Sequence, residues 1–345
     1  MIPSERKRQT ELAAWAQQIL APDLGTPSPS PQLTPVGGDA GFRHYYRIQV
    51  PEGTVLAVDA PPATEDNRAF VDVDGLFASG GVRVPSIRAV DFDAGFMLIE
   101  DFGDTLLLSQ LNSRSTDFLY GKALDVLKRV QASDASSLPP YDTDLLQTEL
   151  MIFREWFIGR LLELELSGED ERLLSGVCER LICSALEQPT GVVHRDYHSR
   201  NLMLLPGDEL GVIDFQGAVR GPLLYDLVSL LKDCYVVWPR ENVENWLRGF
   251  IAEHSKLEAY DLDTCLRWFD WIGLQRHLKC LGIFSRLWLR DGKSQYLTDI
   301  PATFNYVMDV CDRYPELKPL GDWLGTRVAT LMPERMSQVR EEAGL

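Results

Sequence analysis

The sequence predicts an α+β protein with two lobes, a small first lobe rich in β-strands and a second lobe that is mostly helical. Strand-like runs dominate the first 100 residues, whereas amphipathic helical patterns dominate the rest. One short group of strand-like runs interrupts the helical part. A chain of 345 residues that is 45% hydrophobic can fill both cores. We therefore expect lobes at residues 1–100 and 101–345.

The first lobe is expected to begin with a helix and continue as a sheet. One helical face carries Leu12, Trp15, Ala16 and Ile19. Residues 21–35, APDLGTPSPSPQLTP, are predicted to be a connector whose prolines block strand pairing. The runs FRHYYRIQV and VLAVDA flank the turn PEGT and predict a hairpin over residues 42–60. A helix over 65–81 and a buried strand, FMLIED, should follow.

The second lobe is expected to consist of amphipathic helices around a small β-region. The helical period is clear at residues 116–133, 146–166 and 170–186, and it returns from Leu227. Between them lie the strand-like runs GVVH, NLMLLP and ELGVIDF, and PGDE forms the turn between the last two. A polar loop therefore lies between strands within a helical lobe.

Composition excludes several classes of partner. The formal net charge of −17 repels nucleic acid and anionic lipid, so we expect neither as a partner. No run of 18 apolar residues predicts a membrane span. The six cysteines form no CxxC pair, so we expect reduced thiols in or near the core of a cytoplasmic protein. No obligate protein partner is evident, and a small molecule is the expected substrate.

The polar loop carries the chemistry. In VVHRDYHSRNLM, residues 192–203, Asp196 and Asn201 lie five residues apart, and Asp214 ends the next pair of strands. Mg²⁺ prefers oxygen ligands and takes one or two carboxylates from protein, which fits Asn201 and Asp214. Asp196 can then accept a proton from a substrate hydroxyl as its oxygen attacks the γ-phosphoryl group of ATP. The weaker alternative is a polar turn without a chemical role.

These motifs resemble those of a known fold. HRD-x4-N followed by IDF is similar to the catalytic and metal-binding loops of protein-kinase-like proteins. His198 and the form IDFQ resemble more closely the aminoglycoside phosphotransferase and choline kinase superfamily, over residues 35 to 310. The resemblance implies a nucleotide-binding first lobe and a second lobe that holds the catalytic loop, the metal site and the substrate pocket. It also implies ATP and Mg²⁺ as cofactors, with Asp196 as the base and Asn201 and Asp214 as Mg²⁺ ligands.

The resemblance also implies nucleotide-binding residues. LIEDFG, residues 98–103, corresponds to the hinge whose backbone holds adenine and includes Glu100. The loop that covers the phosphates contains Gly37, Gly38 and Gly41, although their spacing is not GxGxxG. Gly37 and Gly38 also fit an ordinary turn.

One departure from the superfamily concerns the lysine that binds the α- and β-phosphates. The second hairpin strand has Val58 and Asp59 where that lysine is expected. Arg43, His44 or Arg47 then supplies the positive charge, or Mg²⁺ and the backbone hold the triphosphate without it.

The substrate is indicated by a narrower resemblance. The lysine-free strand and residues 274–297, LQRHLKCLGIFSRLWLRDGKSQYL, resemble the bacterial anomeric sugar kinases of cell-wall recycling. These phosphorylate N-acetylmuramate and N-acetylglucosamine at C1, whose hydroxyl is acidic enough for one carboxylate base. A muramate carboxylate would need a cation, for which the candidates are Arg276, Lys279 and Arg286. A solvated helix face explains these three residues equally well.

The helix TELMIFREWF suggests further sugar contacts. Its spacing places Glu149, Phe153 and Trp156 on one face, so Glu149 and Trp156 are candidate substrate residues. Ordinary core packing is the alternative for both aromatic residues. Asp226 is expected to brace the catalytic loop and His194 to hydrogen-bond its backbone.

Two other functions remain open. A kinase for an aminoglycoside, choline or homoserine is favoured by the acidic surface, which attracts cations. A nucleotide-binding pseudokinase scaffold is favoured by the missing strand lysine. The complete set of Asp196, Asn201 and Asp214 argues against the scaffold.

Overall fold

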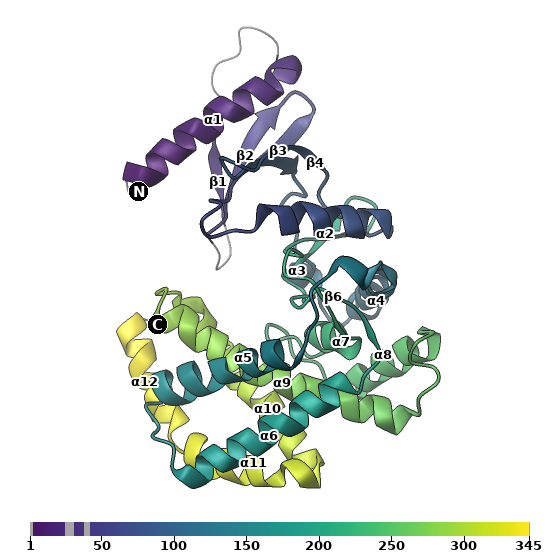
Figure 1. Cartoon of the computed structure of the whole chain (residues 1–345), viewed down its shortest axis with the longest axis vertical. Coiled ribbons are helices and arrows are strands. Elements are labelled where there is room, and N and C mark those ends of the chain that lie inside the picture. Colours follow the sequence, from purple (N-terminus) through teal and green to yellow (C-terminus); the bar gives the residue numbers. More distant parts are fainter. Residues whose placement is uncertain (1–2, 25–30, 38–41, 345) are drawn as a thin grey trace. The chain divides into compact units, whose positions relative to one another are not determined.

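The computed structural model describes residues 3–24, 31–37 and 42–344 (Figure 1). It consists of two compact units. The first comprises Met1–Asn112 and Arg200–Gly217, and the second comprises Ser113–Ser199 and Ala218–Leu345. A small antiparallel sheet lies in the first unit and most helices lie in the second, which confirms the expected α+β class. The functional division at residue 100 stays a prediction.

The first unit contains a five-stranded antiparallel sheet in the order β1-β2-β3-β5-β4. The hairpin expected over residues 42–60 is confirmed as β2 and β3. The prediction that prolines block pairing throughout residues 21–35 is wrong at its end, because Thr34 and Pro35 belong to β1. Proline is tolerated there because β1 is an edge strand. The strands are β1 (Thr34–Val36), β2 (His44–Val50), β3 (Gly53–Asp59), β4 (Ile87–Asp91) and β5 (Phe96–Glu100).

The leading helix α1 (Pro3–Leu24) packs on one face of this sheet (Figure 1). Its residues Leu12, Ala16 and Leu20 are buried against Val55, Ala57 and other sheet residues. Ile19, which we expected on this face, is 42% exposed, so the buried stripe continues through Leu20 instead. Arg8 forms an ion pair with Asp59 of β3. Asp59 is thus used in packing α1.

A second helix, α2 (Asn67–Ser79), also packs in the first unit. It starts where Asp66 caps the amides of Arg68 and Ala69, as expected for an aspartate at this position. Phe70 and Phe77 of this helix contact Phe215, which follows Asp214 in the chain. The short helix α3 (Leu107–Gln110) completes the helices of this unit.

The hairpin of β7 (Leu202–Leu205) and β8 (Glu209–Val212) belongs to the first unit, although it follows the catalytic loop. Leu204 donates to the carbonyl of Thr105, and Val212 donates to that of Arg83. A Cβ at Gly211 would lie 2.4 Å from the Phe102 ring, so only glycine permits this contact. Asn201 and Asp214 are therefore carried by the first unit, whereas the sequence had placed them in the second lobe.

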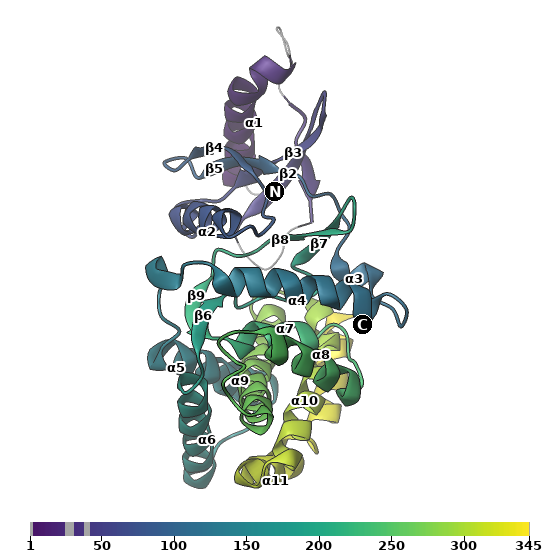
Figure 2. The same ribbon diagram turned by 90° about the vertical axis from the view of Figure 1, so that its right-hand side faces the viewer.

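The second unit is built around the long helix α9 (Leu262–Leu289), most of whose residues are buried (Figure 2). A two-stranded sheet pairs β6 (Thr190–Val193) with β9 (Val219–Pro222). The sequence did not predict β9. The remaining helices are α4 (Thr116–Ala132), α5 (Thr143–Ile152), α6 (Gly168–Leu186), α7 (Leu224–Leu231), α8 (Arg240–Glu253), α10 (Ile300–Arg313), α11 (Lys318–Trp323) and α12 (Met332–Ala343).

The helix expected over residues 146–166 is not uniform. Helix α5 continues as a π-helix over Phe153–Leu161, where the chain passes α9 closely. A Cβ at Gly282 of α9 would lie 2.5 Å from the backbone of Ile152, so a side chain there would clash. The wider π-turn changes which residues share a face beyond position 152. The sequence pattern carried no sign of this change.

All six cysteines are free, as expected, but Cys183 is exposed, contrary to the expectation that all lie in or near the core.

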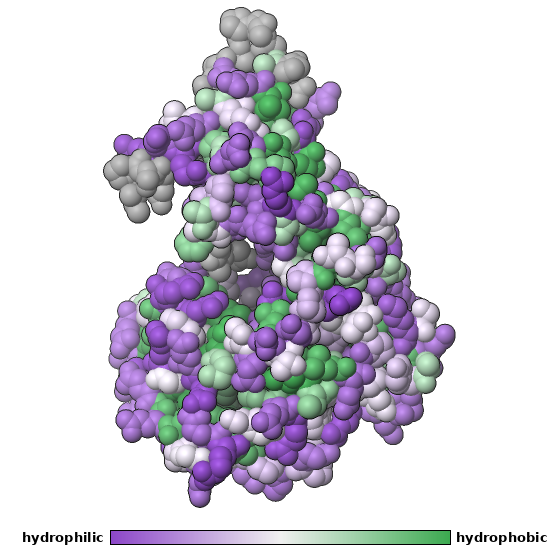
Figure 3. Space-filling model, viewed as in Figure 1, coloured by the Kyte–Doolittle hydropathy of each residue, from purple (hydrophilic) through white to green (hydrophobic). Residues whose placement is uncertain are grey.

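On the face drawn in Figure 3, hydrophilic and hydrophobic residues are mixed. Within the described ranges, every helix is too short or too polar to cross a membrane.

Candidate functional site

The catalytic loop begins where β6 ends at Val193 and is held by two buried aspartates of the second unit. Asp226 accepts the amides of His194 at 2.6 Å and Arg195 at 3.0 Å, which confirms its expected bracing role. Asp233 accepts the Ser199 amide at 3.0 Å and its hydroxyl at 2.5 Å. The loop is therefore fixed on both sides of Asp196.

Backbone strain marks the same segments. Arg195 has a φ of +76° and Asp214 has a φ of +61°, in a region that side chains other than glycine rarely adopt. Each of these backbone conformations costs free energy, which the surrounding hydrogen bonds must offset. Backbone strain of this kind is concentrated at functional sites. The two carboxyl groups expected to act in catalysis, Asp196 and Asp214, are thus both set by unusual backbone geometry.

Asp196 is exposed to solvent, as the predicted base would need to be in order to reach a substrate proton. Partial desolvation raises its pKa, but positive charges outweigh this effect and bring the pKa to about 2. These charges come, in decreasing order, from Lys279, His198, Arg195 and Arg276. Asp196 is therefore ionised at neutral pH.

A buried ion cluster lies in the same unit. Glu149 of α5 is 2% exposed and binds Arg195 and Lys279 at once, with Lys279 Nζ 2.8 Å from Oε1. Tyr141 and Gln275 donate to its other oxygen. Burial raises the pKa of Glu149, but Lys279 and Arg195 bring it to about 2. The charged carboxylate holds both cations in place.

The residues proposed to contact sugar differ in how deeply they are buried and in what they contact. Arg276 and Lys279 are 3% and 5% exposed, so the alternative of a solvated helix face is wrong for them. Trp156 is half-buried and stacks 4.0 Å from the guanidinium of Arg160. It lies in the π-helix, where the spacing from Glu149 no longer places them on one face. Its role in sugar binding stays a prediction.

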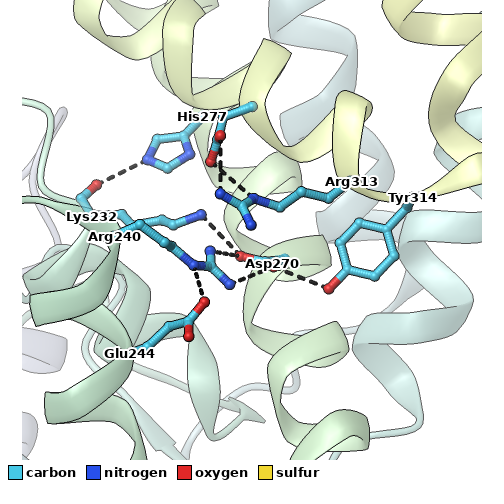
Figure 4. A network of polar contacts seen from close by, with 8 residues as sticks. Lys232, Arg240, Glu244, Asp270, His277, Arg313 and Tyr314 are labelled. Carbon is cyan, nitrogen blue, oxygen red and sulfur yellow. Dashed lines mark hydrogen bonds and ion pairs between the residues drawn. The ribbon is translucent and has the colours of Figure 1, made fainter.

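A second buried ion network in the same unit includes Lys232, Arg240 and Asp270 (Figure 4). Asp270 of α9 accepts from Lys232 Nζ at 3.0 Å and from both Arg240 amino groups at 2.5 and 2.9 Å. Tyr314 also donates to Asp270, and Arg240 binds Glu244. The network anchors the end of α7, because Lys232 directly follows that helix and directly precedes Asp233.

The candidate metal ligands lie together in the first unit. Asn201 Nδ2 is 3.4 Å from Asp214 Oδ2, and Gln216 donates to the other oxygen of Asp214 at 2.7 Å. The Ile213 amide donates to the Asn201 carbonyl, which fixes the approach of the two segments. A carboxylate and an asparagine side-chain amide, whose oxygen can also bind a cation, are a donor set that Mg²⁺ accepts. No group of three or more histidine, cysteine, aspartate or glutamate side chains in the described ranges is arranged to hold a metal.

Arg43 stands out among the cations proposed to replace the strand lysine. It is 6% exposed, lies 3.2 Å from Glu65 and covers the Phe70 ring at 4.9 Å. Burial raises the pKa of Tyr45 to about 12, and the charges of Arg43 and Asp214 both act on this tyrosine. By contrast, Arg47 is bound to two aspartates at the hinge, and His44 is exposed.

The other nucleotide candidates are placed as follows. Gly37 directly follows β1, whereas Gly38 and Gly41 lie outside the described residues. Glu100 ends β5, and its side chain binds Arg83 and Ser86. Its amide donates to the Ser86 carbonyl at 2.9 Å. Glu100 thus fixes the end of β5, and its predicted place in a nucleotide-binding hinge stays a prediction.

Sequence reasoning missed several residues of these sites. Arg195 was noted only as part of the loop motif, yet it binds the carboxylate that also holds Lys279. Ser199, Asp233 and Glu65 were not singled out at all. An available signal was that Asp226 lies inside the apolar pattern of α7 and Asp233 lies just after it, two carboxylates next to a buried helix.

Comparison with known proteins identifies relatives of the chain. The model of the phosphotransferase enzyme family matches residues 32–268. A Pseudomonas aeruginosa protein named N-acetylmuramate/N-acetylglucosamine kinase is 40% identical over 94% of this chain and 98% of its own length.

Solved structures show the same fold at low sequence identity. A Plasmodium vivax ethanolamine kinase has a TM-score of 0.62 at 13% identity and covers 90% of each chain. The ADP-bound aminoglycoside phosphotransferase APH(2'')-Ib has a TM-score of 0.56 at 13% identity, covering 87% of this chain and 98% of its own. These likenesses confirm the protein-kinase-like fold that the loop motifs predicted.

Proposed function

Because the chain belongs to the phosphotransferase enzyme family, we propose that it transfers the γ-phosphoryl group of ATP to the C1 hydroxyl of N-acetylmuramate and N-acetylglucosamine. The chain is a phosphotransferase, and the family uses ATP and a small-molecule acceptor. The observation that carries the choice of sugar is the 40% identity to a kinase of that name along nearly the whole chain. We place the reaction in the cytoplasm, with no obligate protein partner.

Asp196 is the proposed catalytic base. It accepts the proton of the C1 hydroxyl as the sugar oxygen bonds to the γ-phosphorus and ADP leaves. A carboxylate with a pKa of about 2 is a weak base, which suits an anomeric hydroxyl because that hydroxyl is more acidic than others on the sugar. The braces formed by Asp226 and Asp233 keep the loop from moving as the proton is transferred.

Asn201 and Asp214 are the proposed ligands of Mg²⁺. When bound, Mg²⁺ neutralises negative charge on the phosphates of ATP. Two observations support Mg²⁺ binding here. The Asp214 carboxylate lies beside the Asn201 side-chain amide, and the backbone carbonyl of Asn201 accepts a hydrogen bond from the Ile213 amide, which keeps the two segments together. The chain links Asp196 to Asn201 through four residues, so both groups can serve one reaction.

The nucleotide is proposed to bind the first unit, along the hinge that includes Glu100 and under the loop that contains Gly37, Gly38 and Gly41. Arg43 is the best supported replacement for the strand lysine. Its ion pair with Glu65 combines a buried cation with a carboxylate, and Glu65 also accepts the Phe42 amide at the end of the loop. Arg47 is already bound at the hinge.

The sugar is proposed to bind the second unit beside Asp196. Glu149 acts there as a positioning residue, because its carboxylate is already bound by Tyr141, Arg195, Lys279 and Gln275. Lys279 and Arg276 supply positive charge near the base. This charge disfavours a cationic substrate such as choline or an aminoglycoside, and the complete catalytic set disfavours a pseudokinase.

The test is ATP consumption against a panel of acceptors: N-acetylmuramate, N-acetylglucosamine, glucose, choline, homoserine and kanamycin. We expect turnover of the two N-acetyl sugars that disappears when EDTA removes Mg²⁺. Turnover of choline, homoserine or kanamycin alone would contradict the sugar proposal while keeping the kinase. Nucleotide binding without turnover of any acceptor would favour the scaffold.

A further inference from the structure

One buried charge in the second unit has no ion-pair partner among the residues that the structure describes. Arg276 of α9 is 3% exposed, and its Nη1 donates a hydrogen bond to the Cys234 sulfur at 3.6 Å. Its Nε atom is buried and, within the described part of the chain, has no hydrogen-bond partner. Burying a guanidinium removes its hydration, which costs free energy, and without a carboxylate partner no ion pair offsets that cost. The site is therefore suited to an anion that arrives from outside the chain.

The neighbouring cations of α9 differ from Arg276 in this respect. Lys279 is equally buried, but its Nζ lies 2.8 Å from Glu149 and 3.1 Å from the Tyr225 hydroxyl. Arg286 also has a buried Nε without a hydrogen-bond partner among the described residues, but the residue as a whole is only half-buried and so keeps contact with water. Of the three cations proposed for the muramate carboxylate, Arg276 is thus the one that combines burial with an unmet need for an anion.

The charge of Arg276 also influences Asp196, the proposed base. Its positive charge is among those that lower the pKa of Asp196, so it lies within electrostatic range of the base. The thiol of Cys234 contacts Arg276 and supplies only a weak acceptor. The carboxylate of Asp233 acts on Arg276 at longer range, but it is already bound to Ser199. An anion held by Arg276 would therefore belong to a molecule whose other end reaches Asp196.

We propose, building on the proposed function, that Arg276 binds the lactyl carboxylate of N-acetylmuramate and so determines the preference between the two sugars. N-Acetylglucosamine lacks the lactyl group and leaves the guanidinium without its anion. A guanidinium can donate two parallel hydrogen bonds to a carboxylate, which a lysine cannot do. The preference for the acidic sugar is then a property of one side chain.

The experiment compares kcat/KM for N-acetylmuramate, its lactyl methyl ester and N-acetylglucosamine. In wild-type protein we expect the free acid to be preferred over the ester. Arg276→Gln should lower the ratio of kcat/KM for N-acetylmuramate to that for N-acetylglucosamine by roughly 10- to 100-fold, the effect of losing a charge-assisted hydrogen bond. Arg276→Lys should restore part of the ratio, because the charge returns without the paired donors.

Two matched variants locate the effect on the same helix. Arg286→Gln should keep the wild-type ratio, whereas Lys279→Met should reduce turnover of both sugars together, because Lys279 holds Glu149. A ratio unchanged in Arg276→Gln, or one lost instead in Arg286→Gln, would overturn the proposal. Turnover of neither sugar by wild-type protein would contradict the proposed function itself, which is a different result.

Discussion

The second unit contains two buried ion clusters that differ in how their charges are paired. In the network of Figure 4, Lys232 and Arg240 both contact Asp270, and Arg240 also contacts Glu244, so two cations meet two carboxylates. In the cluster beside Asp196, Glu149 pairs with Arg195 and Lys279, while Arg276 forms no ion pair with any described residue. A network that is internally paired needs no ligand. An excess of buried positive charge indicates where an anionic group can bind.

The two clusters also differ in the elements of the chain that they connect. The paired network joins the end of α7 to α8, α9 and the residue after α10, so it fastens elements to one another. The cluster beside Asp196 joins α5 and α9 to the loop that carries Asp196, so it fastens the segment of the proposed base. Removing a charge should therefore affect stability in the first cluster and both stability and turnover in the second.

The largest effect is expected at the base itself. Asp196→Asn should lower kcat by about 1,000-fold, because a general base contributes that order of rate enhancement. The Kd for ATP should be unchanged when measured by calorimetry. Asp208→Asn is the matched control, since Asp208 is an exposed aspartate at a turn with a φ of +59°, which asparagine tolerates. Normal turnover in Asp196→Asn would refute the assignment of the base.

The next effect is expected in the paired network. Asp270→Asn should lower the free energy of unfolding by about 3 to 5 kcal/mol, because it leaves Lys232 and Arg240 buried without their carboxylate. Urea denaturation measures this change. Asp309→Asn removes an exposed pair with Arg313 and should cost less than about 1 kcal/mol.

The same variant separates the two clusters. The ratio of kcat/KM for N-acetylmuramate to that for N-acetylglucosamine should not change in Asp270→Asn, since its network has no part in sugar choice. A change in this ratio without a loss of stability would show that the two clusters do not have separate roles.

A smaller effect is expected at Glu149. Its pKa is about 2 in the folded protein, below its ordinary value of 4.5, so it stabilises the fold above pH 4.5 and loses this contribution as the pH falls toward 2. Glu149→Gln should lower the free energy of unfolding by roughly 3 kcal/mol at pH 7, with a smaller loss at pH 3. Glu155→Gln, which removes an exposed carboxylate, serves as the control. An equal loss at both pH values would contradict the ionised pair.

The sequence predicted the parts of this account that depend on local motifs. The loop around Asp196 and Asn201, the strand that ends at Asp214 and the hairpin of β2 and β3 all have short-range signals. It could not separate Arg276 from Lys279, because Lys279 pairs with Glu149, 130 residues away in the chain, whereas Arg276 hydrogen-bonds Cys234, 42 residues away. It also missed β1 and β9, whose strands are short and contain proline.

The helix at residues 143–161 shows why face assignments fail over longer distances. An α-helical count placed Trp156 beside Glu149, but the π-helix that begins at Phe153 changed the rotation per residue. The π-helix begins where Gly282 of α9 passes the backbone of Ile152 closely, a tertiary contact that local periodicity does not contain. Sequence patterns thus predicted local loops and hairpins better than the face on which a residue lies in a helix that passes another element closely.

³¹P and ¹H NMR of the product formed from N-acetylmuramate and Mg-ATP identifies the hydroxyl group that the protein phosphorylates. We predict a phosphate on C1, with the anomeric proton coupled to phosphorus and the lactyl group unchanged. A phosphate at any other hydroxyl, or no phosphorylated sugar from active protein that consumes ATP with another acceptor, would contradict the account.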